Sequence, residues 1–195
     1  MWRHTLVAIK LVLVTTVLLG LAYPLVITGL AQVIFPHQAN GSLVREGNRV
    51  IGSALIGQQF AQPGYFHPRP SAAGKGYDAT ASGGSNLGPT SRKLAQRVAA
   101  DVGRLTKENP GLRPGKIPAD MVTTSASGLD PGISPANAYA QVSRVAKARG
   151  MSEDSVRRLV ESNVIDRQFG FLGEPRVNVF CLNRALDAVT KGESQ

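Results

Sequence analysis

The chain opens with one long hydrophobic stretch, residues 11–35, and then changes to short apolar patterns separated by polar turns. The stretch contains no Asp, Glu, Lys, Arg or His and is apolar on all sides, whereas a helix on the surface of a soluble domain has one polar face. Its 25 residues would form a helix of roughly 37 Å, which exceeds the ~30 Å hydrocarbon core of a bilayer. The pattern therefore predicts a transmembrane helix over residues 11–35.

A cleaved signal peptide is the alternative, because Arg3 and Lys10 form a basic N-terminal flank. The apolar region of a signal peptide usually has about 7–15 residues, so the length favours a retained anchor. Basic flanks stay in the cytoplasm, and long C-terminal domains cross the membrane regardless of their own charge. We therefore expect a protein of the bacterial inner membrane, with a short cytoplasmic N-terminus at residues 1–10 and a periplasmic domain at residues 36–195.

Beyond residue 36 the pattern predicts a series of short elements. A β-hairpin is expected at residues 42–56, because two apolar arms flank the turn triplet Glu46-Gly47-Asn48. Apolar residues three and four positions apart predict an amphipathic helix at 90–107, and Ser134 and Ser152 are expected to start two more helices. The other predictions are irregular loops at 58–91 and 123–134, a helix end at Gly150, a strand at 177–180 and a last helix capped by Asn183. Together they predict a mixed α/β (α+β) domain.

Composition adds positive charge without a nucleic-acid motif. The chain has 22 Lys and Arg against 13 Asp and Glu, and residues 1–36 hold two of the bases and none of the acids, which leaves the following domain a surplus of seven. No helix-turn-helix or zinc spacing accompanies this charge, so we expect a solvated basic surface and no nucleic-acid partner. No Cys/His cluster offers metal ligands, and Cys181, the only cysteine, is expected to fill space in the core.

A glycine- and serine-rich loop at residues 82–89 carries the candidate chemistry. Successive amides of this kind can form an anion-binding nest before a helix, and a turn whose side chains bond their own backbone is the alternative. The loop lacks both the G-x-S-x-G elbow of hydrolases and the phosphate-binding P-loop, so no catalytic residue is assigned. The candidate anion-binding residues are Ser82, Gly83, Gly84, Ser85 and Asn86.

Seven stretches of the sequence resemble the C subunit of the bacterial Kdp potassium-transporting ATPase. They follow the family's order and cover nearly the whole chain. These stretches are Tyr23–Gly29, Phe35–Leu43, Gly52–Gln58, Phe66–Ala72, Ser82–Pro89, Ser127–Ala136 and Phe171–Val179. The chain departs from the family pattern at Asp78, where asparagine is usual, and at Gly132, where histidine is usual.

The resemblance implies an accessory subunit of a potassium-uptake pump and not a free-standing enzyme. The family's complex joins a channel-like potassium-translocating subunit to a P-type ATPase subunit, and these two chains and the lipid bilayer are the implied partners. The C subunit is described as assembling and stabilising the complex, and as a catalytic chaperone that raises the ATP affinity of the ATPase subunit. The implied ligands are K⁺ as the transported ion and ATP through the complex, with no tightly bound cofactor and no metal site.

The resemblance also implies a nucleotide-binding site at Ser82–Asn86, because Ser82-Gly83-Gly84 is similar to the signature of ABC transporters. ATP is cytoplasmic, whereas the predicted topology places this loop outside, so a periplasmic cap over the ion entrance fits the sequence better. A membrane-anchored periplasmic enzyme or binding module that uses the Ser82–Pro89 loop is the alternative function.

Within the predicted membrane helix, four residues at four-residue steps mark one face: Thr16, Gly20, Pro24 and Thr28. Small residues let two helices approach closely, and threonine hydroxyls can form hydrogen bonds across the contact. We expect this face to dock on the channel-like subunit. The alternative is a lipid-exposed face with an incidental proline kink.

Overall fold

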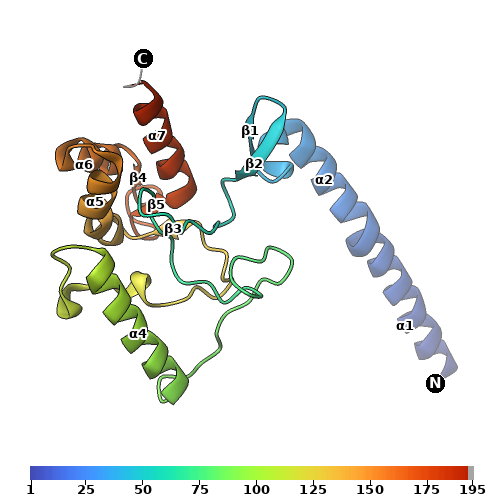
Figure 1. Cartoon of the computed structure of the whole chain (residues 1–195). Coiled ribbons are helices and arrows are strands. Elements are labelled where there is room, and N and C mark those ends of the chain that lie inside the picture. The colour runs from blue at the N-terminus through green and yellow to red at the C-terminus, as the bar shows by residue number, and fades with distance from the viewer. Residues whose placement is uncertain (193–195) are drawn as a thin grey trace. The chain divides into compact units, whose positions relative to one another are not determined.

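A computed structural model describes residues 1–192, and Figure 1 shows the order of their helices and strands. The chain divides into two compact units, Met1–Ser53 and a larger unit that begins at Ala54. The first holds a long helix and a hairpin, and the second holds helices, a small sheet and long loops. This is the predicted architecture, one apolar helix followed by a mixed α/β domain.

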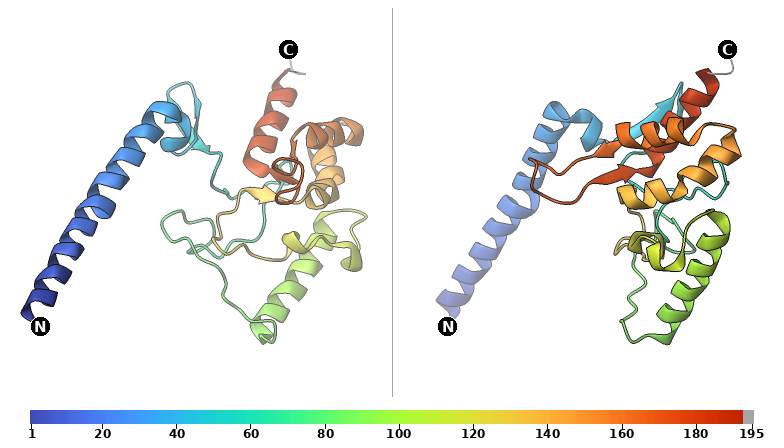
Figure 2. Two further views of the ribbon diagram at one scale, coloured as in Figure 1. Left: turned by 180° about the vertical axis from the view of Figure 1, so that it is seen from behind. Right: turned by 90° about the vertical axis from the view of Figure 1, so that its left-hand side faces the viewer.

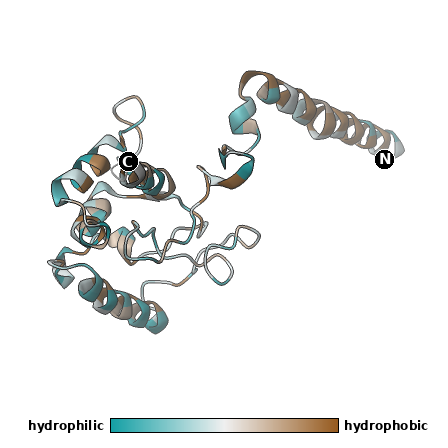
Figure 3. Ribbon diagram, turned by 45° about the horizontal axis from the view of Figure 1, so that its top comes forward, coloured by the Kyte–Doolittle hydropathy of each residue, from teal (hydrophilic) through white to brown (hydrophobic). Residues whose placement is uncertain are grey.

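The first unit is dominated by a helix that runs from Trp2 to Ile34. It consists of α1 (Trp2–Thr15), a π-helical segment (Thr16–Ala22) and α2 (Tyr23–Ile34). The helix is long and apolar enough to cross a membrane, and none of its most apolar window is buried in the protein. Figure 3 shows it as a largely hydrophobic rod. The helix begins well before residue 11, and which of its turns lie in a bilayer stays a prediction.

A short helix, α3 (Pro36–Ala39), and a β-hairpin complete the first unit. Strands β1 (Leu43–Glu46) and β2 (Arg49–Ser53) pair antiparallel, with Glu46 opposite Arg49. The two-residue turn between them begins with Gly47 at a φ of 58°, a backbone conformation that glycine adopts without steric cost. The predicted hairpin is therefore confirmed, although its second strand ends at Ser53 and not at residue 56.

Four helices form the body of the second unit. They are α4 (Arg92–Glu108), α5 (Pro135–Arg149), α6 (Glu153–Ser162) and α7 (Val179–Gly192), and two 3₁₀ turns, Pro114–Lys116 and Ala119–Met121, follow α4. The side chains of Ser91, Ser134 and Ser152 each accept a hydrogen bond from the backbone amide three residues later. These serine caps confirm the predicted starts of α5 and α6, and Gly150, at a φ of 66°, ends α5 as predicted.

A small antiparallel sheet and two apolar clusters hold these helices. The strand order is β3 (Gly132–Ile133), β5 (Arg176–Asn178) and β4 (Val164–Ile165). The larger cluster joins the sheet to α5, α6 and α7, and the smaller one joins α4 to the turns after it. The fully buried members of the larger cluster include Phe66, Ala138, Val145, Val156, Val160, Val177, Leu182 and Leu186.

The start of α7 differs from the prediction. The helix begins at Val179, directly after β5, because the side chain of Asn178 accepts a hydrogen bond from the backbone amide of Cys181 at 3.1 Å. Asn183 therefore lies inside the helix and is not its cap, and it is buried. Cys181 lies on the exposed side of the same helix, so the prediction that it fills the core was wrong.

Candidate functional site

The centre of the second unit is an irregular segment, residues 59–70, which we call the strap. The strap has no strand partner, and two amide side chains take the place of one. Asn183 accepts a hydrogen bond from the Phe66 amide at 2.8 Å and donates one to the Phe66 carbonyl at 3.0 Å. Gln141 bonds both backbone groups of His67 in the same way, at 2.7 and 3.0 Å. The helices α5 and α7 thus fix the strap with Phe66 fully buried between them.

Arg144 reinforces this arrangement from α5. It is only 7% exposed, and it donates hydrogen bonds to the carbonyls of Pro63 and Tyr65 and to the side chains of Asn109 and Gln141, at 2.5–3.0 Å. All four acceptors are neutral, and burial lowers the pKa of Arg144 to about 10, so the guanidinium stays charged at pH 7. Its buried charge is stabilised by hydrogen bonds to oxygen atoms of the strap, Asn109 and Gln141, and the Glu108 carboxylate favours the charged form without bonding it directly.

Arg149, five residues further along α5, holds the same part of the strap. Its Nε donates to the Gly64 carbonyl at 2.7 Å, and its guanidinium lies 4.5 Å from the centre of the Tyr65 ring. Asp187 of α7 forms an ion pair with Arg149 at 2.7 Å and accepts a hydrogen bond from the Tyr65 hydroxyl at 3.2 Å. This part of the strap is therefore fixed by charge and ring contacts.

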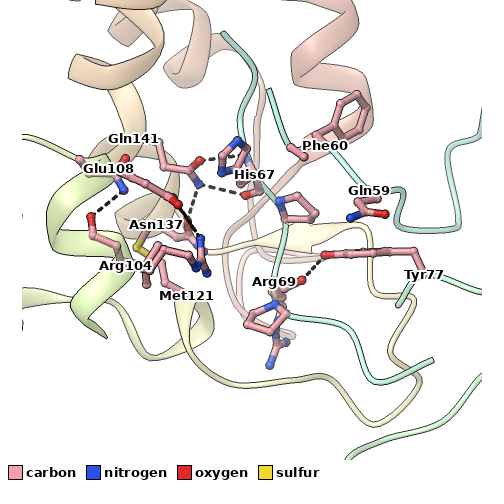
Figure 4. Close-up of a pocket in the computed structure, with 15 residues that line it drawn as sticks. Gln59, Phe60, His67, Arg69, Tyr77, Arg104, Glu108, Met121, Asn137 and Gln141 are labelled. Carbon is pink, nitrogen blue, oxygen red and sulfur yellow. Dashed lines mark hydrogen bonds and ion pairs between the residues drawn. The ribbon is translucent and has the colours of Figure 1, made fainter. Parts of the chain in front are cut away.

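A cavity of about 280 Å³ opens between the strap, the end of α4 and the start of α5 (Figure 4). The His67 ring lines it, with Nε2 3.1 Å from the Gln62 carbonyl, and burial together with the nearby Arg144 charge lowers the pKa of His67. Arg104 and Glu108 of α4 also line the cavity and form an ion pair at 3.0 Å. Tyr77 donates its hydroxyl proton to the Arg69 carbonyl, and burial raises the pKa of Tyr77.

These groups make the cavity polar but leave it without a poised nucleophile. The lowered pKa of His67 favours its neutral form at pH 7. The opposite charges of Arg104 and Glu108 cancel in their ion pair. Among residues 1–192, no three His, Cys, Asp or Glu side chains are placed to hold a metal ion. No pattern in the sequence predicts this cavity, although His67 and Arg69 lie in one of the stretches that carry the family resemblance.

The candidate loop at Ser82–Asn86 packs against a second irregular segment, residues 123–131, which leads into β3. The Gly83 amide and the Ser82 hydroxyl both donate to the Ser127 carbonyl, at 2.8 and 3.0 Å. A Cβ on Gly84 would lie 3.0 Å from the Ala126 carbonyl oxygen, and Thr124 bonds the Ser85 hydroxyl at 3.3 Å. Of the five residues only Asn86 has a positive φ. The Gly83 amide and the Ser82 hydroxyl, two of the predicted anion-binding donors, are therefore already bonded to the second segment. Nucleotide binding by this loop stays a prediction.

Gly128 is the tightest point of this loop pair. Its φ is +66°, and a Cβ at this position would lie 2.6 Å from the Ala73 nitrogen and 2.7 Å from the Gly83 oxygen. The Ser71 hydroxyl donates to the Gly128 carbonyl at 2.6 Å. Arg69 and Asp130 add an ion pair at 3.0 Å. Three of the stretches that carry the resemblance, 66–72, 82–89 and 127–136, thus meet in one place.

Thr16 and Gly20 of the predicted docking face lie in the π-helical segment, and Pro24 and Thr28 follow in α2. The Tyr23 amide donates to the Leu18 carbonyl, five residues back, and Pro24 has no amide hydrogen. The Leu19 carbonyl therefore lacks the donors that a helix normally provides at the fourth and fifth following residues. Within a bilayer such a group is costly unless a neighbouring helix or side chain supplies a donor. A Cβ on Gly20 would lie 3.8 Å from the Thr16 methyl group, so these two residues share one side.

A family model described as "K+-transporting ATPase, c chain" matches residues 5–188. A potassium-transporting ATPase KdpC subunit of Myxococcus xanthus is 59% identical over 188 residues, which covers 96% of this chain and 89% of the relative. Proteins with the same description from Caulobacter vibrioides and Koribacter versatilis are 62% and 58% identical, and cover 89% and 96% of this chain and 87% and 95% of their own lengths.

Proposed function

The chain belongs to the KdpC family, the c chains of K⁺-transporting ATPases, and we propose that it serves such a pump as an accessory subunit with no catalytic step of its own. The single observation that carries this is the family match at residues 5–188, which runs through both structural units. The contacts of the second unit support a non-catalytic role, because Gln141, Arg144 and Asn183 use their hydrogen bonds to hold backbone. The proposed role is to assemble and stabilise the complex and to raise the ATP affinity of its ATPase subunit.

Purification of the pump with and without this chain tests the proposal. The affinity-tagged full-length chain is expected to retain the other pump subunits from detergent-solubilised membranes. K⁺-stimulated ATP hydrolysis by the purified assembly is expected to fall when the chain is left out. Full K⁺-stimulated ATPase activity without it would contradict the proposal, and turnover of a small substrate by the isolated chain would favour the enzyme alternative.

The proposed partner of the membrane helix is the channel-like subunit, which would pack on the face of Thr16, Gly20, Pro24 and Thr28. The Leu19 carbonyl supports this, because a partner helix with a polar side chain can supply the missing donor. The double variant Gly20→Leu/Thr28→Leu is expected to reduce recovery of the pump subunits at least tenfold, since each added side chain holds the helices apart. The measurement is the subunit ratio after detergent purification.

A matched control places the same bulk on the opposite side of the helix. Ala22 and Val26 each lie two residues from their nearest neighbours on the docking face, which is about half a turn in an α-helix or a π-helix. The double variant Ala22→Leu/Val26→Leu is expected to keep the wild-type subunit ratio. Equal recovery of both double variants would exclude the proposed face.

The proposed orientation places residues 36–195 in the periplasm of a bacterial inner membrane, with residues 1–10 in the cytoplasm. Cys181 gives a direct test, because it is the only cysteine and is exposed. A membrane-impermeant maleimide added to intact cells with a permeable outer membrane is expected to label wild-type protein. A Cys181→Ser/His4→Cys variant is expected to be labelled only after the inner membrane is opened.

The same labelling result bears on the nucleotide-binding role of Ser82–Asn86. With the second unit outside, direct contact with cytoplasmic ATP is not available, and we propose that this unit caps the ion entrance of the pump. Labelling of Cys181 only from the cytoplasmic side would overturn the cap and restore the nucleotide role. In either case the contacts of Gly83 and Gly84 with the second loop limit how much of the loop a nucleotide could reach.

A further inference from the structure

An apolar tip projects from the second unit between β4 and β5. The connection at residues 166–175 extends away from the helices of the unit, as the right-hand view of Figure 2 shows. Phe169, Phe171 and Leu172 at its end are 80%, 70% and 48% exposed. Two phenylalanines and a leucine that project together into water are unusual on a soluble surface and indicate a binding partner.

The tip, residues 168–172, is held in shape by its own backbone. Gln168 and Leu172 exchange two hydrogen bonds of 2.9 Å, and the amides of Gly170 and Phe171 donate to carbonyls of residues 167 and 168. Phe169 has a φ of +54°, which is sterically unfavourable for a bulky side chain. The loop accepts this strain in a conformation that leaves the Phe169 ring exposed to solvent.

Charged residues lie directly behind the apolar tip. Arg167 and Glu174 face each other across the connection in a 2.7 Å ion pair, and Asp166 and Arg176 lie beside them in the sequence. With Arg176, the first residue of β5, these four charges sum to zero, so residues 166–176 have no net attraction for anions or cations. They would resist transfer into an apolar medium and so set the depth to which the tip can go.

We propose that the tip inserts into the interfacial layer of the bilayer that holds the Trp2–Ile34 helix. Most backbone donors of the tip are satisfied within the loop, and this is the condition for leaving water and entering lipid without a hydrogen-bonding partner. Phenylalanine and leucine are suited to the boundary between headgroups and acyl chains. The long helix of the same chain keeps the second unit near a membrane surface and raises its effective concentration there. The inference needs only this membrane anchor, and neither the proposed orientation nor the proposed partner subunits.

Tryptophan fluorescence of the full-length chain in phosphatidylcholine nanodiscs tests the insertion. Trp2 is the only tryptophan, so Trp2→Phe gives a silent background and Phe171→Trp places the probe in the tip. The emission is expected to be shifted to the blue and to be quenched by phosphatidylcholine brominated near the headgroup end of its chains. Because residues 166–176 carry no net charge, the quenching is expected to be the same at low and high salt.

The control is Ala148→Trp in the same background, at an exposed position on α5. Its emission is expected to stay at the wavelength of a water-exposed indole and to be unaffected by brominated lipid. Emission from the Phe171→Trp variant that matches this control would overturn the proposal. If the indole of the Phe171→Trp variant were blue-shifted but unquenched in membranes that contain the whole pump, a protein groove and not lipid would be the occupant, which would also overturn it.

Discussion

Replacing Arg144 by methionine is expected to lower the free energy of unfolding by about 3 kcal/mol or more. Methionine retains much of the apolar stem but none of the donors. Four acceptors lose the guanidinium at once, and of these only the Gln141 oxygen keeps another donor within residues 1–192, the His67 amide. A buried acceptor without a partner costs roughly 1–3 kcal/mol, so this loss outweighs what is regained by no longer burying a charge. Scanning calorimetry of the full-length chain in mild detergent should show a Tm lower by about 6–12 °C.

Two further variants separate hydrogen bonding from charge. Arg144→Lys keeps the positive charge, but a lysine ammonium cannot reach the four acceptors that the planar guanidinium bonds. We therefore expect a free energy of unfolding between those of the wild type and Arg144→Met. Arg113→Met removes an arginine from an exposed position after α4 and is expected to change stability by less than about 0.5 kcal/mol. Wild-type stability of Arg144→Met would show that the strap does not depend on this guanidinium.

Replacing Gly128 by alanine is expected to separate the two loops that meet at this residue. The left-handed conformation alone costs an L-residue roughly 1–2 kcal/mol, and the contacts at 2.6 and 2.7 Å are with backbone atoms, which cannot move aside without shifting the loops. Overpacking adds about 1–3 kcal/mol, so the total loss is about 2–5 kcal/mol. Calorimetry reports the stability, and faster proteolysis within residues 72–90 would report the loss of loop packing.

Gly150 provides the matched control because it has the same φ of +66°, but no atom lies within 4 Å of the point that a Cβ would occupy. Gly150→Ala therefore carries the conformational cost without the clash, and about 1–2 kcal/mol is expected. Proteolysis of the 72–90 segment should stay at the wild-type rate. Equal losses for the two variants would mean that the contacts of Gly128 with Ala73 and Gly83 contribute nothing to stability.

The elements that the sequence predicts correctly are those with a local physical cause. Ser134 and Ser152 start helices because a serine side chain bonds an amide only three residues away, and Gly150 ends one because it adopts a positive φ. The hairpin turn at Gly47 has the same origin. The apolar helix needs only length and the absence of charge. In each case the pattern and its partner lie within a few residues.

Most of what the sequence does not predict depends on partners that are distant in the sequence. Asparagine is a common residue type at helix N-caps, but the side-chain amide of Asn183 bonds Phe66, 117 residues away. Cys181 lies in an apolar run, yet the start of α7 at Val179 turns it toward solvent. The cavity at His67 is lined by residues of the strap, α4 and α5, so no single stretch of the sequence predicts it. The loop at Ser82–Asn86 was identified from its glycines, but its packing against Ala126 and Ser127 was not.

The hydrogen bonds between Phe66 and Asn183 have a consequence for folding during synthesis on the ribosome. A ribosome that has just added Phe66 must add 117 more residues before its amide partner exists, which takes on the order of 10 s. Throughout that interval the ring that ends fully enclosed has to remain in water or on a chaperone. A nascent chain that ends before Asn183 would have the apolar N-terminal helix but could not complete the fold of the second unit. It would be exposed to quality-control proteases with that unit unfolded.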